Sequence, residues 1–180
     1  MKNFKSLFLA AFCLISVSAL VPNTNEAQAS DFGAGILLGP TFGNSSTFFT
    51  YGVTGNYKIM SPWGVGASLT RYSTSTTIGT NKTDSSLTTI TAQGTYSLAQ
   101  YLPGLRAGAQ LGLGLTSASA TIGTLVASAS STSFIIGPMA GYDFNLNERL
   151  SVGGEGNLFF STATGSSAFF QLLGTLKYWF

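Results

Sequence analysis

Apolar residues recur at every second position over long stretches of this chain, and this feature most restricts how the chain folds. From Leu105 to Thr116, Leu and Ala at odd positions alternate with Arg, Gly, Gln and Thr at even positions, and the pattern returns at 50–59 and 88–98. Successive side chains of a β-strand point to opposite faces, so a period of two predicts strands. Helices are disfavoured because these stretches are rich in Gly and Thr and have no 3.6-residue stripe.

The same pattern, followed along the chain, predicts eight strands. They are Phe32–Leu38, Phe48–Ile59, Trp63–Tyr72, Leu87–Leu98, Leu105–Ser117, Ser133–Phe144, Leu150–Phe160 and Ala168–Phe180. Short turns are expected at 60–62, 99–104 and 145–149, and longer Ser/Thr/Gly-rich loops at 41–47, 73–86, 118–132 and 161–167. Alternating short turns and long loops are typical of outer-membrane barrels, whose short turns lie in the periplasm. An even number of strands then predicts that both chain ends are periplasmic.

Charge is scarce in this sequence. Charged residues are 8% of the chain, against roughly 25% in ordinary soluble domains. After residue 29 there are six Lys or Arg and five Asp or Glu, which excludes the basic patch of a nucleic-acid-binding protein. No segment after Val21 has the length and apolarity of a membrane helix, so a closed membrane-spanning barrel is expected. A soluble lipocalin-like or avidin-like barrel is the alternative, but its outer face is charged, whereas the polar face here is mostly Thr, Ser, Gln, Asn and Gly.

The first 29 residues predict a cleaved signal peptide. Lys2 and Lys5 precede an apolar run at 6–21, and the small residues Ala27 and Ala29 precede Ser30. The run is shorter than the ~20 residues that a membrane-spanning helix needs. Cys13, the only cysteine, lies inside the run, so the mature chain has no disulfide. We expect cleavage after Ala29 and one barrel domain over residues 30–180.

Aromatic residues gather toward both ends of the expected strands. Trp63 and Trp179 fall at the turn-side ends with several tyrosines. Phenylalanine gathers at the loop-side ends, at Phe42, Phe48, Phe49, Phe134, Phe159, Phe160, Phe169 and Phe170. Rings at both edges of an apolar band form the girdles of membrane barrels, so both groups are expected to face lipid.

The chain ends in an alternating aromatic strand in which Leu176, Tyr178 and Phe180 share one face. This resembles the C-terminal signature that the barrel-assembly machinery reads. With the signal peptide and the loop pattern, the chain resembles the small eight-stranded outer-membrane barrels of the A and X types, with no motif for one subfamily. The resemblance implies an all-β, single eight-stranded antiparallel up-and-down transmembrane barrel in the bacterial outer membrane. Its implied partners are lipid, lipopolysaccharide and the assembly machinery, with no cofactor.

Five charged residues on the polar face are predicted to form a polar cluster in the lumen, and all but the first of them a plug in its lower half. They are Lys58, Arg106, Asp143, Glu155 and Lys177. A Lys or Arg that faces lipid at the membrane midplane costs about 2–4 kcal/mol, so these residues are expected inside. A hairpin that turns around 123–125 places Arg106 directly opposite Asp143, with Glu155 and Lys177 diagonal on adjacent strands. Arg71 falls on the apolar face, so it is expected either above the apolar band or turned inward by a bulge.

The residue types argue against an enzyme. The chain has no histidine to act as a base or to join a metal cluster, and no cysteine nucleophile after residue 29. Two classes of function remain: a structural or surface-interaction role through the loops, and a narrow porin-like channel for small solutes. The channel rests on inward glycines that would leave volume unfilled, namely Gly108, Gly112, Gly114, Gly137, Gly141 and Gly153. The apolar loop residues Ile122, Leu125 and Val126 add a hydrophobic docking or entry point near the outer rim.

Overall fold

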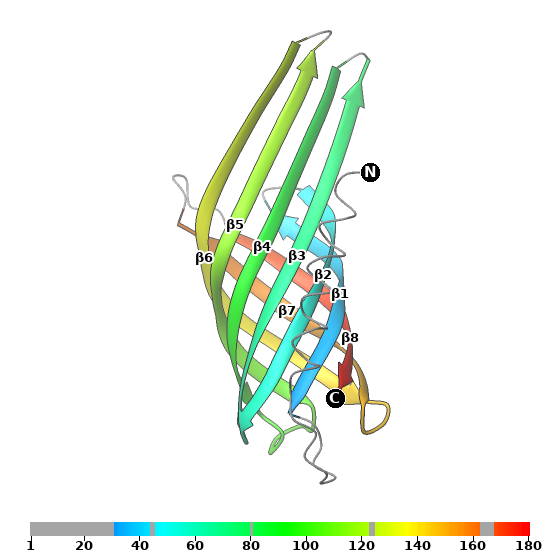
Figure 1. Ribbon diagram of the computed structural model, residues 1–180, viewed down its shortest axis with the longest axis vertical. Helices are drawn as coiled ribbons and strands as arrows, with labels where there is room; N and C mark the ends of the chain where they lie inside the picture. The colour runs from blue at the N-terminus through cyan, green and yellow to red at the C-terminus, as the bar shows by residue number, and fades with distance from the viewer. Residues whose placement is uncertain (1–30, 44–45, 80, 123–124, 163–167) are drawn as a thin grey trace.

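Eight antiparallel strands form the whole described structure. The computed structural model describes residues 31–43, 46–79, 81–122, 125–162 and 168–180. The strands are β1 Phe32–Gly43, β2 Ser46–Met60, β3 Trp63–Ile78, β4 Asn81–Ser97, β5 Leu105–Ile122, β6 Leu125–Asn145, β7 Leu150–Ser161 and β8 Ala168–Trp179. Each strand pairs with the next, and β8 pairs with β1 (Figure 1). The predicted eight-stranded up-and-down barrel is therefore confirmed.

The seam between β1 and β8 brings the two ends of the barrel domain together. Gly33 lies opposite Trp179, and the Phe180 amide donates to the Phe32 carbonyl at 3.0 Å. Both ends lie on the side of the short turns, and their periplasmic location stays a prediction. The expected signal peptide and its cleavage site after Ala29 lie outside the described residues. Among the described residues, no helix has the length and apolarity needed to cross a membrane.

Four strands extend far beyond the others, and the loops predicted at 73–86 and 118–132 are wrong. β3 and β4 stay paired as far as Ile78 and Asn81, and β5 and β6 as far as Ile122 and Leu125. Threonine favours strands, and cross-strand hydroxyl pairs such as Ser86–Ser117 at 3.0 Å support them, so the low-complexity sequence remains in the sheet. We call residues 73–78, 81–86, 117–122 and 125–130 the protruding sheet, which rises above the ends of β1, β2, β7 and β8 (Figure 1).

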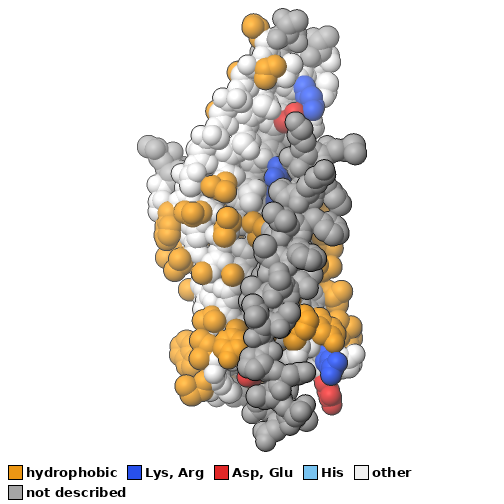
Figure 2. Space-filling view, viewed as in Figure 1, with side chains coloured by type: hydrophobic (Ala, Val, Ile, Leu, Met, Phe, Trp, Pro, Cys, Tyr) orange, Lys and Arg blue, Asp and Glu red, His pale blue; other side chains and the backbone are white. Residues whose placement is uncertain are grey.

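The barrel carries an apolar belt on its outer surface. Hydrophobic side chains gather over the lower part of the molecule, and the protruding sheet is mostly polar (Figure 2). Outward-facing residues that are 40–51% exposed include Ile36, Leu38, Ile90, Leu111, Leu113, Ile136, Val152, Leu172 and Leu176. On β3 the belt runs from Trp63 to Leu69 and ends at Arg71. The eight residue steps from Trp63 to Arg71, at ~3.3 Å each and a tilt of ~40°, span about 20 Å, close to the ~25 Å apolar band of outer-membrane barrels.

The phenylalanine girdle is only partly as expected. Phe42, Phe49, Phe134, Phe160 and Phe170 are 38–66% exposed on the outer surface. Phe159, however, is buried in the lumen, where its ring stacks on Phe169 at 4.9 Å, and Phe48 stacks on Tyr72 at 4.6 Å. The prediction failed for these inward rings because two successive residues of a strand cannot face the same side. Phe160 takes the outward position, so Phe159 points inward.

Candidate functional site

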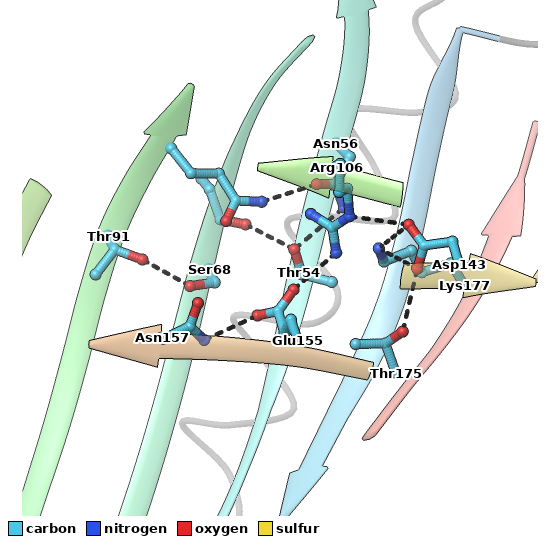
Figure 3. Close-up of polar contacts among 12 residues, drawn as sticks. Thr54, Asn56, Ser68, Thr91, Arg106, Asp143, Glu155, Asn157, Thr175 and Lys177 are labelled. Carbon is cyan, nitrogen blue, oxygen red and sulfur yellow. Dashed lines mark hydrogen bonds and ion pairs between the residues drawn. The ribbon is translucent and has the colours of Figure 1, made fainter. Parts of the chain in front are cut away.

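The lower half of the lumen contains a four-residue ion cluster. The Arg106 side chain donates from Nε to Asp143 Oδ2 at 3.0 Å and from Nη2 to Glu155 Oε2 at 2.9 Å. Lys177 Nζ lies 2.9 Å from both carboxylate oxygens of Asp143. Figure 3 shows Asp143 bonded to both cations and Arg106 bonded to both carboxylates. The structure therefore brings four of the five predicted lumen charges together, and two positive charges balance two negative ones.

The strand register differs from the expected one. Ile122 pairs with Leu125, so Arg106 lies opposite Gly141, and Asp143 is two residues further along β6. The direct opposition of Arg106 and Asp143 is therefore wrong, although both residues stay on the inward face. The long Arg106 side chain still reaches Asp143 because Gly141 leaves room for it. A Cβ at Gly141 would lie 3.1–3.2 Å from the guanidinium atoms.

A second glycine explains how Lys177 of β8 reaches Asp143 of β6. Gly153 of β7 lies between them, opposite both Asp143 and Thr175. A Cβ at Gly153 would lie 2.9 Å from Asp143 Oδ1, so any side chain there would obstruct the ion pair. Glu155 lies opposite Leu173 and turns to Arg106, and its other oxygen accepts from Asn157 at 3.1 Å. Lys177 and Glu155 are therefore connected through Asp143 and Arg106, and not by a direct contact across their diagonal positions.

Lys58 does not join this cluster. Its side chain is exposed at the turn-side mouth of the barrel, with Nζ 4.3 Å from the centre of the Trp179 ring. Trp179 lies on the inward set of β8, and its Nε1 donates to Ser151 Oγ at 3.1 Å. The expectation of Lys58 in the lumen polar cluster is corrected because its position, at the end of β2, is at the mouth of the barrel. Trp179 is likewise corrected from a lipid-facing ring to a residue at the lumen mouth.

Neutral side chains fill the lumen above the ions. Pairs of hydroxyls lie 2.6 Å apart at Thr41–Thr50, Ser68–Thr91 and Thr70–Thr89. Five apolar residues are also buried there, 0–3% exposed: Leu37, Ile135, Met139, Phe159 and Leu173. The sequence pattern did not predict these buried residues, because apolar residues are expected on the lipid-facing side of a membrane barrel. Strict alternation from Glu155 and Lys177 would have found Phe159 and Leu173.

The inward glycines do not leave the volume that was expected of them. At Gly108, Gly112, Gly137 and Gly153, an added Cβ would meet a backbone carbonyl oxygen of the neighbouring strand. Glycine at these positions therefore permits close strand approach and does not open a path. Two buried polar atoms, Gln110 Nε2 and Asn157 Oδ1, have no hydrogen-bond partner among the described residues. The lumen is a packed interior in which polar and apolar layers alternate.

Substitution of Gly141 tests whether the Arg106 arrangement depends on the missing side chain. We expect Gly141→Val to lower the free energy of unfolding by about 1–3 kcal/mol, because the new methyl groups displace the guanidinium in a packed interior. The measurement is urea unfolding in phospholipid vesicles, followed by tryptophan fluorescence. Gly94→Val is the matched control, since a Cβ at Gly94 meets nothing within 4 Å. Equal losses in both variants would contradict the explanation.

The C-terminal residues lie on the outer surface. Leu176, Tyr178 and Phe180 are 41–49% exposed, and the Tyr178 and Phe180 rings are 5.1 Å apart. Their recognition by the assembly machinery stays a prediction. In the described part of the chain, no group of three or more His, Cys, Asp or Glu residues is arranged to hold a metal ion. Asp143 and Glu155 are each bonded to a cation, which leaves neither as an unpaired acid or base.

An apolar belt around a closed antiparallel barrel with a filled, charge-balanced lumen defines an integral outer-membrane β-barrel. The sequence supports this class over nearly its whole length: residues 7–170 match the family described as outer membrane protein beta-barrel domain. The chain belongs to this family, and the protein is located in the bacterial outer membrane. A comparison with curated protein sequences gives no match.

Solved structures share this fold at low sequence identity. Ail, the attachment invasion locus protein of Yersinia pestis, in complex with the heparin analogue sucrose octasulfate, is 17% identical with a TM-score of 0.64, over 84% of this chain and 97% of Ail. Neisserial surface protein A is 15% identical with a TM-score of 0.60, over 87% and 100%. OprG of Pseudomonas aeruginosa is 15% identical with a TM-score of 0.51, over 85% and 97%. These similarities concern the fold.

Proposed function

We propose that this protein is a non-enzymatic surface-interaction protein, in which the barrel anchors the protruding sheet outside the cell. The observation that carries the proposal is that four strands continue as one sheet beyond the apolar belt. β2 pairs with β3 only as far as Tyr72, and β7 pairs with β6 only from Ile135. Within the described residues, the sheet therefore has two unpaired edges, at 73–78 and 125–133. The turn-side chain ends are then periplasmic.

The composition of these edges supports binding of a partner strand. Natural sheet edges are usually protected by charges, prolines or bulges, and residues 125–133 contain no charged residue and no proline. Such an edge accepts an extended segment through backbone hydrogen bonds. The tip of the sheet adds apolar surface, since Ile78, Leu125 and Val126 are 71–76% exposed. Leu125 and Val126 lie far above the lumen, so we propose docking and not entry into the barrel. Ail, which has the same fold, is described as an attachment invasion locus protein.

Attachment of living cells tests this proposal. We expect cells that produce the protein to attach to an epithelial layer or to one another several-fold more than cells without it. A shortened variant, with two-residue turns joining β3 to β4 after Ser73 and β5 to β6 after Ser117, is expected to lose this gain. Heat-dependent gel mobility checks folding, and an impermeant maleimide on Thr47→Cys, an exposed loop-side position that both proteins keep, checks surface exposure. Equal attachment by the folded, surface-exposed full-length and shortened proteins would refute the proposal.

The narrow channel is the second candidate, and the packing of the lumen opposes it. The lumen contains Trp179 at its mouth, the ion cluster, and the buried ring of Phe159. We expect the refolded mature chain to give no conductance steps in a planar bilayer, because eight-stranded barrels have room only for side chains. Reproducible small steps that grow in Arg106→Ala would establish a gated pore instead.

A further inference from the structure

The outer face of the sheet changes abruptly from apolar to hydroxylated. Strand pairing sets Leu69, Ile90, Leu113 and Phe134 side by side across β3 to β6, all on the outward face. Two residues higher, the row is Arg71, Thr88, Leu115 and Thr132, and the next row consists of four serines, Ser73, Ser86, Ser117 and Ser130. The boundary of the apolar belt on these strands therefore lies at the Arg71 row. The first alternative for Arg71, above the apolar band, agrees with this position.

A hollow lies on this outer face directly above the boundary. Its volume is about 640 Å³, and it is lined by residues of all four long strands, including Arg71, Lys82, Asp84, Ser117 and Ser130. Ligand sites in proteins commonly have volumes of about 300–1,000 Å³. Half of the lining residues are serines of the outward set, so the walls offer many hydroxyl groups. This hollow is separate from the lumen, which the same strands enclose on their other face.

Arg71, at the lower end of the hollow, has no bonded anion among the described residues. Its side chain is half-buried and makes no hydrogen bond or ion pair with any residue that the structure describes. Thr88, directly opposite on β4, is neutral, as is Tyr51 on β2. No described residue uses the donors of this arginine, and its planar group suits phosphate oxygens.

The upper end of the hollow has a different chemistry. Lys82 Nζ lies 3.0 Å from Asp84 Oδ2, and both side chains are about half exposed. The Ser75 hydroxyl, together with Lys82, lowers the pKa of the Asp84 carboxyl, so Asp84 is ionised at neutral pH. The Asp84 carboxylate accepts hydrogen bonds, the Lys82 ammonium donates them, and the surrounding serine hydroxyls do both. Such a set of groups suits the hydroxyl groups of a sugar.

We propose that this hollow binds the phosphorylated sugar headgroup of an outer-leaflet glycolipid, with a phosphate on Arg71 and sugar hydroxyls on the serines and the Lys82–Asp84 pair. A lipid whose acyl chains lie against Leu69, Ile90 and Leu113 brings its headgroup to the Arg71 row without further movement. The hollow opens on the outer face of the sheet, so its lining residues face the surrounding outer leaflet and not the lumen. This orientation favours a lipid of that leaflet as the ligand. The inference does not depend on the attachment role, since the strand edges at 73–78 and 125–133 are not used.

Binding of purified lipopolysaccharide tests this site. The refolded mature chain in detergent micelles is titrated with fluorescently labelled lipopolysaccharide, and heat-dependent gel mobility confirms that every variant is folded. We expect Arg71→Gln to weaken binding about tenfold, which corresponds to ~1.4 kcal/mol. Arg149→Gln, which removes an exposed arginine at the opposite end of the barrel, is the matched control and should bind like the wild type. Ser117→Phe, which fills the hollow without changing charge, should also weaken binding.

Chemical variants of the ligand identify its source. For the wild type, lipopolysaccharide treated with phosphatase should bind about tenfold more weakly than untreated lipopolysaccharide. For Arg71→Gln, the treated and untreated lipids should bind equally, because the group that contacts the phosphate is already absent. Unchanged binding by Arg71→Gln, or an equal loss in Arg149→Gln, would overturn the proposal. A soluble sulfated heparin oligosaccharide that displaces the labelled lipid at the same concentration as unlabelled lipopolysaccharide would also overturn the proposal. That result would indicate a site for free polysaccharide.

Discussion

Asp143→Asn is expected to lower the free energy of unfolding by about 3–5 kcal/mol, because it leaves buried cations without their partner. Asp143 is the only carboxylate bonded to Lys177 among the described residues, and the lysine side chain is 1% exposed. The same substitution removes one of the two ion pairs of Arg106. The shape of the side chain is preserved, so the loss reports charge and not packing.

Urea unfolding of the refolded chain in phospholipid vesicles, read by tryptophan fluorescence and gel mobility, measures this effect. Asp84→Asn is the control, since its ion pair with Lys82 is exposed on the protruding sheet and surface pairs contribute little. The double variant Asp143→Asn/Lys177→Met should recover much of the stability, because no charge is then left unpaired. A loss in Asp143→Asn no larger than in Asp84→Asn would show that the lumen is hydrated and the cluster is not structural.

Leu111→Arg is expected to destabilise the protein in bilayers by about 2–4 kcal/mol, the cost of an arginine that faces lipid near the midplane. Leu111 is 51% exposed and lies in the row of Ala67, Ala92 and Ile136, halfway between the rows of Trp63 and Arg71. This row is therefore the expected centre of the apolar belt.

Ser117→Arg is the matched control for this substitution. Ser117 lies on the same strand and the same outward face, three rows higher, beyond the boundary at Arg71. We expect it to change the free energy of unfolding by less than about 0.5 kcal/mol, as is usual at exposed surface positions. The same urea titration in vesicles measures both variants. Equal costs at Leu111 and Ser117 would mean that the protruding sheet is also in lipid and that the belt has been located wrongly.

Local pattern determined the faces of the strands well and their ends poorly. Alternation set Arg106, Asp143, Glu155 and Lys177 on the inward face, and the structure has all four there. The loop predictions failed at 73–86 and 118–132 because Ser, Thr and Ala alternate without the apolar contrast that reveals a strand. Only cross-strand partners keep those residues in a sheet, and partners are distant in sequence.

The sequence by itself determined the class of this protein: few charges, period-two apolar faces and the absence of a long apolar segment after Val21 leave a membrane barrel as the structure that satisfies the backbone. Only the tertiary structure decided which charges meet. A two-residue change of register moved Gly141, not Asp143, opposite Arg106. Closure of the barrel and the absent side chain of Gly153 then brought Lys177 to Asp143 across β7, while Lys58, on the same face, was left at the mouth. Alternation fixes the direction of a side chain, whereas its height in the lumen depends on register and closure, which are properties of the whole sheet.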